Sequence, residues 1–276
     1  MKSAPTGARG DTAGRRAALL PALRARATVA PVPPREALTL PDGRGIGSID
    51  AALAMELHRA GLLMQVEGHG GMPAWRPVAR EESLDASLER IAGWLREAGR
   101  LGRWRNEALD VTTTEGDVVG RIERAAVRAL GITTFAVHLI GTGAQGGTWV
   151  QQRALDKATD PGLWDTLMGG LRGAGESVAE TLERETWEEA GLRIADLGSI
   201  RPVGRLTMRR PVAEGYMVEH LDVFEAVVPG HLTPVNRDGE VERFECLDDA
   251  ALSERLEADR FTLEAALMLC GAVRLR

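Results

Sequence analysis

The chain has 276 residues, which is enough for one large domain or two smaller ones. Its composition, 44% hydrophobic and 27% charged, is typical of globular proteins, and its net charge of −6 disfavours nucleic acid and anionic membranes as partners. No apolar run approaches the roughly 20 residues that span a bilayer. The two cysteines lie outside any CxxC pair, which argues against a disulfide framework or a zinc site and favours a reducing cytoplasm.

The first half of the sequence predicts a flexible leader followed by a small α+β domain. Residues 1–18 are rich in arginine and alanine and contain no apolar stretch, so we expect a flexible leader there. Residues 19–130 predict these elements in chain order: a short helix before Pro31, a hairpin turning at Asp42-Gly43, helices at 50–60 and 80–98, a strand pair around Glu115-Gly116, and a helix ending at Gly131.

The second half, residues 131–276, predicts a larger domain of strands and helices. In chain order the pattern indicates strands at 133–141, 148–154 and 164–170, a loop and helix at 171–190, strands at 199–210 and 215–228, an edge strand within 236–248, and a closing helix at 252–271. This order is typical of an α+β fold, with an α/β/α sandwich built on a mixed β-sheet.

The segment Gly169–Leu192, with the sequence GGLRGAGESVAETLERETWEEAGL, joins a glycine-rich loop to an acidic helix. Glycines let a backbone approach a ligand closely, although such a loop alone fits an ordinary turn equally well. Ser177 and Glu180 have the spacing of a capping box, so a helix begins directly after the loop. The free N–H groups at that helix start suit a phosphate.

The acidic part of this helix carries three crowded carboxylates, Glu185, Glu188 and Glu189. Their spacing puts them on one helix face, where their repulsion disfavours the helix unless a cation binds between them. The alternative is a solvated acidic surface. However, a small apolar stripe on the same helix adjoins the carboxylates, so this face borders the core. Carboxylate oxygens without histidine or cysteine favour Mg²⁺ or Mn²⁺.

The spacing of this segment resembles the Nudix box at seven fixed positions: Gly170, Glu176, Arg184, Glu185, Glu188, Glu189 and Gly191. Such a match arises by chance on the order of 10⁻⁸ times per window. Thr186 departs from the box, which has an aliphatic residue there. The resemblance implies a Nudix hydrolase, a pyrophosphohydrolase that cleaves a diphosphate linkage with metal-activated water. It further implies metal ligation by Glu185, Glu188, Glu189 and the Gly170 carbonyl, with Arg184 and Glu188 as catalytic residues.

Residues outside the box complete the predicted site. The resemblance implies a general base on a later loop, and we assign it to Glu240, for which an ordinary turn residue is the alternative. We assign substrate binding to four residues: Arg153, Lys157, Gly169 and Trp164. Lys157 fits a plain turn equally well, and an aromatic residue entering a strand is more often part of the core.

Three further segments, WRNEALDV, IERAAVRALGITTFAVHLIG and NRDGEVERF, look like the Nudix proteins related to fungal thiamine pyrophosphokinase, which carry an N-terminal domain of uncharacterised role. This resemblance implies thiamine diphosphate or a damaged form of it as substrate. A nucleoside diphosphate-type substrate such as ADP-ribose, or a non-catalytic regulator on the same fold, are the alternatives. We expect the N-terminal domain to form one wall of the cleft. The sequence is also compatible with a homodimer.

The run from Gln151 to Gly170 also resembles isopentenyl diphosphate isomerases, which share this fold. Those enzymes place a catalytic cysteine near the strand that holds the tryptophan. This chain has Leu167 and Met168 there and no cysteine, so we reject an isomerase.

Overall fold

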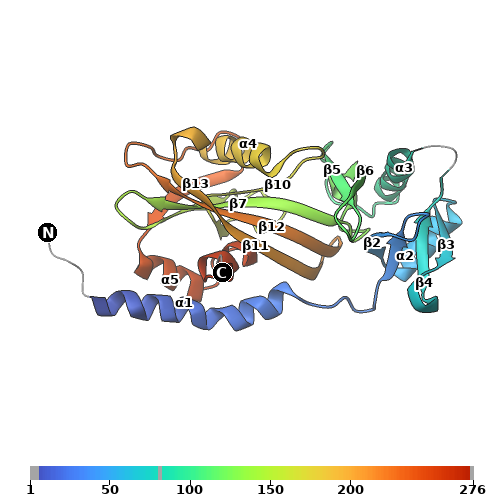
Figure 1. Cartoon of the computed structure of the whole chain (residues 1–276), viewed down its shortest axis with the longest axis horizontal. Helices are drawn as coiled ribbons and strands as arrows, with labels where there is room; N and C mark the ends of the chain where they lie inside the picture. Colours follow the sequence, from blue (N-terminus) through green and yellow to red (C-terminus); the bar gives the residue numbers. More distant parts are fainter. Residues whose placement is uncertain (1–5, 80–82, 274–276) are drawn as a thin grey trace.

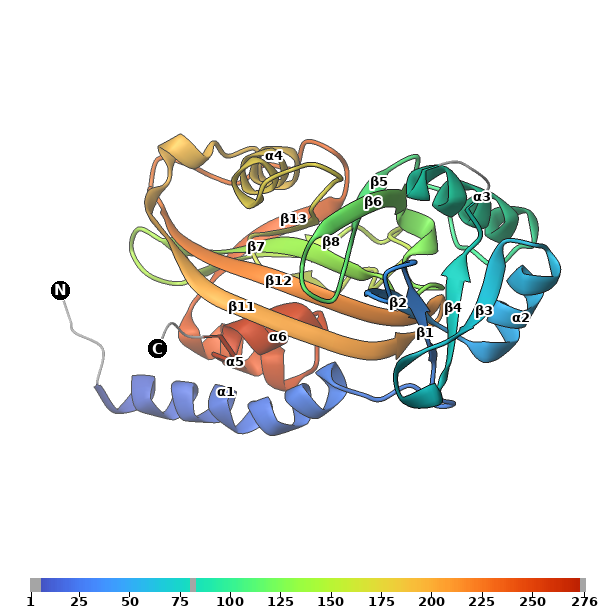
Figure 2. The same cartoon turned by 45° about the vertical axis from the view of Figure 1, so that its right-hand side comes forward.

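The computed structural model describes residues 6–79 and 83–273, with side chains from residue 12 onward. A smaller α+β region and a larger region built on a seven-stranded sheet lie side by side (Figure 1). The first helix, α1 (Thr6–Ala27), lies beneath the larger region although it comes before the smaller one in the chain (Figure 2).

The smaller region is a four-stranded sheet with two helices. The strands, in the order β2-β1-β4-β3, are β1 (Glu36–Thr39), β2 (Gly45–Ile49), β3 (Leu63–Glu67) and β4 (Pro73–Pro77), and the helices are α2 (Ala51–Arg59) and α3 (Leu84–Glu97). The predicted hairpin is confirmed as β1–β2, and Asp50 caps α2 as predicted. Strands β3 and β4 were missed by the sequence patterns. The predicted start of the next helix at residues 80–82 lies outside the described residues.

A hairpin of β5 (Ala108–Thr112) and β6 (Val118–Glu123) confirms the predicted strand pair and leads to the larger region. The helix predicted to end at Gly131 is wrong, because only one 3₁₀ turn, Arg124–Ala126, forms there. Segments of both regions hold the chain after that turn. The amide of Tyr216 donates to the Arg128 carbonyl, and that of Ser48 donates to the Leu130 carbonyl.

The larger sheet has the order β11-β12-β7-β8-β13, with β10 paired to β7 and β9 paired to β8. Its strands are β7 (Thr133–Gly143), β8 (Thr148–Arg153), β9 (Trp164–Asp165), β10 (Met168–Leu171), β11 (Gly198–Val212), β12 (Gly215–Val228) and β13 (Val241–Leu247). Strands β7 and β12 are parallel and the other pairs are antiparallel, so the sheet is mixed.

Helices cover both faces of this sheet (Figure 1). Helix α4 (Val178–Ala190) lies on one face, and α5 (Asp249–Glu257) and α6 (Leu263–Leu269) lie on the other with α1. The predicted fold class is therefore confirmed: an α/β/α sandwich on a mixed sheet, preceded by an α+β region.

Two predicted elements of the larger region are each split in two. The closing helix breaks after Glu257 because Asp259 has a φ of 50° and Phe261, 2% exposed, forms a β-bridge with Trp164. The strand predicted at 164–170 divides into β9 and β10, because β9 pairs with β8 whereas β10 crosses to pair with β7. Both breaks depend on partners that lie far away in the sequence.

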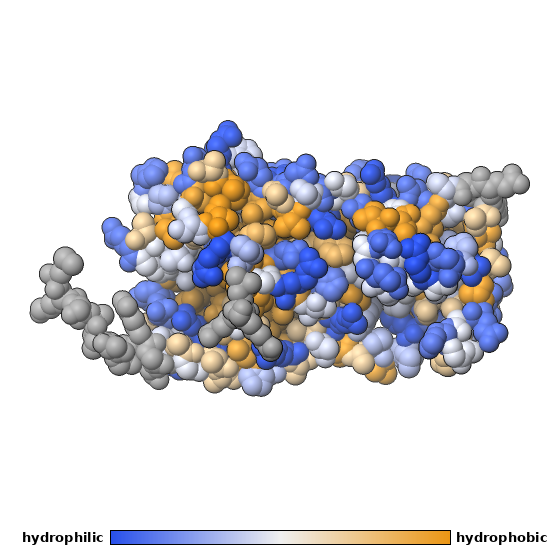
Figure 3. All heavy atoms as spheres, in the orientation of Figure 1, coloured by the Kyte–Doolittle hydropathy of each residue, from blue (hydrophilic) through white to orange (hydrophobic). Residues whose placement is uncertain are grey.

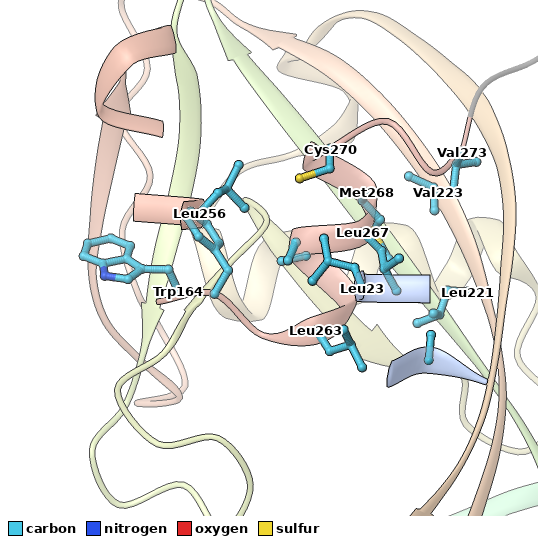
Figure 4. Close-up of a cluster of buried hydrophobic side chains, with 14 of the residues drawn as sticks. Leu23, Trp164, Leu221, Val223, Leu256, Leu263, Leu267, Met268, Cys270 and Val273 are labelled. Atoms are coloured by element: carbon cyan, nitrogen blue, oxygen red, sulfur yellow. The ribbon is translucent and has the colours of Figure 1, made fainter. Parts of the chain in front are cut away.

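The leader prediction is wrong for residues 6–18, which belong to α1; residues 1–5 lie outside the described residues. Leu23 of α1 packs beside Leu263 and Leu267 of α6 in a shared core (Figure 4). Arg15 forms an ion pair with Glu257 of α5. Burial of the apolar side of α1 stabilises it as a helix, so α1 packs with the larger region and not with the smaller one. We keep a domain boundary near residue 131 as a proposal.

The face of the molecule in Figure 3 has hydrophilic side chains interspersed with apolar ones over both regions. Within the part of the chain that the structure describes, no helix is long and apolar enough to cross a membrane.

Candidate active site

The glycine-rich loop and α4 form as the sequence predicted. Ser177 accepts a hydrogen bond from the Glu180 amide, and Glu180 accepts one from the Ser177 amide, so the capping box is confirmed. Gly191 ends the helix with a φ of 63°, a conformation that glycine adopts without strain. The position and length of α4 then decide which carboxylates turn toward β10.

Glu185 and Glu189 project from α4 onto the two glycines of β10. Glu189 is 2% exposed, and its Oε2 accepts hydrogen bonds from the Gly169 amide at 3.0 Å and from Gln151 Nε2 at 2.8 Å. A Cβ atom on Gly170 would lie 1.9 Å from Glu185 Cδ. The absence of a side chain at Gly170 is therefore what lets Glu185 reach the sheet.

Arg184 binds Glu176 of the loop before α4 and two glutamates of the helix, Glu185 and Glu188. Its Nε and Nη2 donate to the two carboxylate oxygens of Glu176 at 2.7 and 2.8 Å. Its Nη1 donates to Glu185 at 2.8 Å and to Glu188 at 3.1 Å. The Arg184 hydrogen bonds hold the pKa of Glu176 at about 2. Arg184 thus fixes the direction of Glu185, as the resemblance to the box implied.

The two buried carboxylates are hard to ionise. Burial raises the pKa of Glu189 to about 8, and the nearby charge of Glu185 adds to the rise. Burial also raises the pKa of Glu185 to about 7, against the opposing charge of Arg184. A cation between them would favour their charged forms.

These pKa values predict a pH dependence for the metal-free protein. Between an unfolded pKa of 4.5 and folded values of about 7 and 8, the folded state binds more protons than the unfolded state. The free energy of unfolding therefore falls as pH rises across that interval. We expect the melting temperature in EDTA to fall from about pH 5 to about pH 9, and to fall less in Glu189→Gln. An identical pH profile for the variant and the parent chain would contradict this origin.

The donor set fits Mg²⁺ or Mn²⁺ in part. Glu185, Glu189 and the Gly170 carbonyl supply hard oxygen ligands at the wall of one cavity. Within residues 6–79 and 83–273, however, no three acidic, histidine or cysteine side chains converge as a ready cation cage. Glu188 is tied to Arg184, and its side chain is 44% exposed. The structure therefore brings together two of the three predicted carboxylates and leaves Glu188 at the rim.

Glu185 and Glu189 face a cavity of about 630 Å³ that lies between the two regions of the chain. Residues 102–128 of the smaller region line one side, including Arg103, Arg105, Arg124 and Arg128. Residues of the N-terminal region therefore line one side of this cavity. The net charge of the chain is negative, but these arginines place positive charge beside the cavity, which favours an anionic ligand there.

The other predicted site residues fall into two groups. Glu240 lines the cavity and forms an ion pair with Lys157. Burial acts to raise the pKa of Glu240, but the hydrogen bond and charge of Lys157 outweigh it, so the pKa lies below its usual value. Arg153 also lines the cavity and donates to the backbone carbonyls of Thr159 and Asp160. Its guanidinium therefore braces the loop before β9.

Trp164 does not have the predicted position beside the ligand. It is 3% exposed and belongs to the core around α6, where it lies at the edge of the cluster (Figure 4). The guanidinium of Arg255 lies 4.1 Å from its ring centre. Its β-bridge to Phe261 holds it there, so stacking on a ligand is excluded.

The smaller region also holds the glycine-rich loop directly. Both carboxylate oxygens of Asp110 in β5 accept from the Gly175 amide at 3.1 Å, and the carbonyl of Ala108 accepts from the Ala174 amide at 2.9 Å. Asp110 is 8% exposed, and Gly175 has a φ of 79°. The loop that precedes α4 is therefore positioned by a strand more than 60 residues earlier in the chain.

Asp110→Ala is expected to lower the turnover of a reaction at this site about tenfold, because the loop before Glu185 and Glu189 loses its anchor. The unpaired Gly175 amide should also cost about 1–3 kcal/mol of stability. Steady-state kinetics and thermal unfolding measure both effects. Asp117→Ala is the control, since Asp117 lies in the same hairpin but forms only an exposed ion pair with Arg44. Equal kinetics for the two variants would contradict a positioning role for Asp110.

Comparison with known protein families finds a match to the larger region. Residues 132–266 match the NUDIX domain family model. These residues of the chain are thus similar to a NUDIX domain. They span β7 to α6 and include the whole Gly169–Leu192 segment.

Individual relatives show the same relationship. The chain is 29% identical over 188 residues to Nudix hydrolase 20, chloroplastic, of Arabidopsis thaliana, covering 67% of this chain and 50% of that protein. It is also 29% identical over 168 residues to an isopentenyl-diphosphate Delta-isomerase of Leifsonia xyli, covering 59% and 88%. A solved structure from Deinococcus radiodurans, 24% identical, covers 60% of this chain and 98% of that one with a TM-score of 0.49. The chain spans about half the length of the first plant relative.

Sequence reasoning missed several residues that line the cavity or hold its walls: Asp110, Gln151, Asp165, Arg210, Glu219 and Glu264. One of these residues, Glu219, could have been found from the sequence pattern. Glu219 stands on β12 in phase with the buried Met217 and Leu221, where a charged residue is unusual. His138 is buried and bonded to Thr166, as expected of a core histidine, but it also lines the cavity.

Proposed function

We propose that this chain is a metal-dependent hydrolase that cleaves a diphosphate linkage in a small organic diphosphate. The observation that carries the proposal is the pair Glu185 and Glu189, buried against Gly169 and Gly170 at the wall of a cavity that also holds arginines and Lys157. Carboxylates with raised pKa values in such a position are typical of functional sites.

Each residue then has a role. Glu185, Glu189 and the Gly170 carbonyl would hold Mg²⁺ or Mn²⁺, with Glu188 joining for a second ion, and Arg184 orients Glu185. A bound metal would supply a Lewis acid that neutralises the diphosphate and activates water. Glu240 would accept a proton from the attacking water, since Lys157 keeps its carboxylate charged. Arg153, Lys157 and the Gly169 backbone contact the phosphates.

We further propose thiamine diphosphate, or a damaged form of it, as the substrate. The support is the resemblance of three segments, on both sides of residue 131, to Nudix proteins related to fungal thiamine pyrophosphokinase. The products are the monophosphate and inorganic phosphate. A cytoplasmic location, favoured by the cysteine usage, belongs to the same proposal.

An isomerase is not supported, although one relative carries that name. Cys270 is buried in the core around α6, and Cys246 is exposed on β13. Neither lines the cavity that Glu185 and Glu189 face. The chain thus has no thiol at the place where the resembling isomerases have theirs.

The test is a panel of diphosphates with Mg²⁺, read as phosphate or monophosphate release by the full chain. The panel contains thiamine diphosphate, its oxo and oxy analogues, ADP-ribose, NADH and dinucleoside polyphosphates. We expect hydrolysis that EDTA abolishes, with the thiamine compounds preferred. A tenfold preference for a nucleotide, about 1.4 kcal/mol in transition-state binding, would overturn the thiamine assignment. No hydrolysis of any member would favour a ligand-binding regulator.

A further inference from the structure

The cavity continues well beyond the residues used above. On β7, Gly169 of β10 pairs with His138, and Glu219 of β12 pairs with Thr134. Four residues of strand separate these levels, roughly 13 Å along the sheet. A second group of lining residues occupies that far part, and the proposed mechanism uses none of them: Arg210, Met217, Glu219, Thr262 and Glu264.

Glu264, in the first turn of α6, differs from the other carboxylates of the cavity. Five of those have a donor from elsewhere in the protein: Glu185, Glu189, Glu219, Glu240 and Asp165. Glu264 has no hydrogen bond or ion pair to another residue within the described part of the chain. Its side chain is partly exposed where it lines the cavity, and it contributes no contact that stabilises the fold.

The surroundings of Glu264 disfavour its charged form. Burial raises its pKa to about 7, and the charges of Glu219 and Asp165 add to the rise. The compensating charge is that of Arg210, which also lines the cavity and interacts with Glu264 only through space. One wall of the cavity thus combines a carboxylate that is free to accept a hydrogen bond with a nearby positive charge.

A ligand edge that carries an N–H donor next to a ring nitrogen or carbonyl acceptor complements this wall. Amino-substituted nitrogen heterocycles have such an edge, whereas a plain alkyl or isoprenoid chain has none. A site built to bind a donor rejects an analogue that lacks it, because the buried acceptor is then left without a partner.

We propose that the far part of the cavity is the recognition site for the organic group of the substrate, and that Glu264 selects an amino-substituted nitrogen heterocycle by accepting its N–H. This rests on the proposed function, since the diphosphate would lie at Glu185 and Glu189, roughly 13 Å along the sheet from the level of Glu219. Glu264 is a specificity residue and takes no part in the hydrolysis.

The experiment compares ligands that differ only in an amino or a keto group, using monophosphates so that binding is independent of hydrolysis. The two pairs are thiamine and oxythiamine monophosphate, and adenosine and inosine monophosphate, titrated calorimetrically with Mg²⁺ into the full chain. We expect the amino member of at least one pair to bind about tenfold more tightly, and Glu264→Gln to reduce that ratio to about twofold or less. Equal binding within both pairs, or an unchanged ratio in the variant, overturns the proposal.

A thermal readout separates recognition from a structural role. Glu264→Gln should keep or raise the melting temperature, because it removes a carboxylate that has no partner among the described residues and lies beside the charges of Glu219 and Asp165. A lowered melting temperature with equal weakening of all four ligands would show that Glu264 is structural. Glu254→Gln is the matched control, an exposed glutamate of α5 that should change neither ratio nor melting temperature.

The same variants separate this inference from the proposed function. Glu264-dependent selection without hydrolysis of any diphosphate would leave the recognition site standing and overturn the hydrolase. If diphosphates are hydrolysed but the preference for the amino ligands is unchanged in Glu264→Gln, the hydrolase stands and the recognition site is overturned.

Discussion

Glu189→Gln is expected to lower kcat for diphosphate hydrolysis roughly 10³-fold, about 4 kcal/mol of transition-state stabilisation. The variant removes a charged metal ligand but keeps the volume of the side chain. The new amide oxygen still accepts from the Gly169 amide. Gln151 Oε1, which has no hydrogen-bond partner within residues 6–79 and 83–273, offers an acceptor for the new NH₂ group. Kinetics with saturating Mg²⁺ and calorimetric metal titration measure the loss.

The fold should survive this change. Burial has already raised the pKa of Glu189 to about 8, so the charged form contributes nothing favourable to the metal-free protein. We expect the melting temperature in EDTA to stay within about 5 °C of the parent value or to rise. Glu183→Gln is the control, since Glu183 is exposed on the same helix. Full activity of Glu189→Gln, or of the parent chain in excess EDTA, would refute the metal mechanism.

Gly170→Ala should be nearly as damaging, with kcat/KM reduced roughly 10²-fold. The added Cβ would lie 1.9 Å from Glu185 Cδ, so one of the two must move. Glu185 is the side chain that yields, because β10 is held by its pairing to β7. Its carboxylate then leaves the position opposite Glu189, and metal affinity falls with activity. Mn²⁺ titration followed by calorimetry would show the loss directly.

Gly93→Ala is the matched control for this variant, because a Cβ there meets nothing within 4 Å and the position lies inside α3. It should leave activity unchanged and stabilise the helix slightly. If Gly170→Ala bound metal and hydrolysed diphosphates like the parent chain, the packing of Glu185 against β10 would have no bearing on the reaction.

The two regions of the chain build this site together. The larger region supplies the glutamates, whereas the smaller region supplies the arginines of one wall and, through Asp110, the anchor of the glycine-rich loop. Changes in the smaller region should therefore alter both turnover and substrate choice. This arrangement gives the N-terminal region a physical role beside the family domain.

Local features of this protein could be predicted from its sequence alone. The capping box of Ser177 and Glu180, the helix end at Gly191 and the direction of Glu185 and Glu189 all depend on residues within one or two helical turns of each other. Helical periodicity fixes such relations before any tertiary contact forms. The mixed sheet with helices on both faces also followed from the order of strands and helices.

The tertiary structure decided everything that depends on segments far apart in the chain. The short helix predicted before Pro31 begins much earlier, at Thr6, because burial of the apolar side of α1 against α5 and α6 stabilises the added turns. Trp164 is an aromatic residue of the kind that stacks on ligands, yet its β-bridge to Phe261 holds it in the core. Asp110 and Glu264 lie far from the box in sequence, and no periodicity marks them. Their positions depend on long-range packing, which is why only the folded chain shows that one holds the glycine-rich loop and the other faces the cavity unpaired.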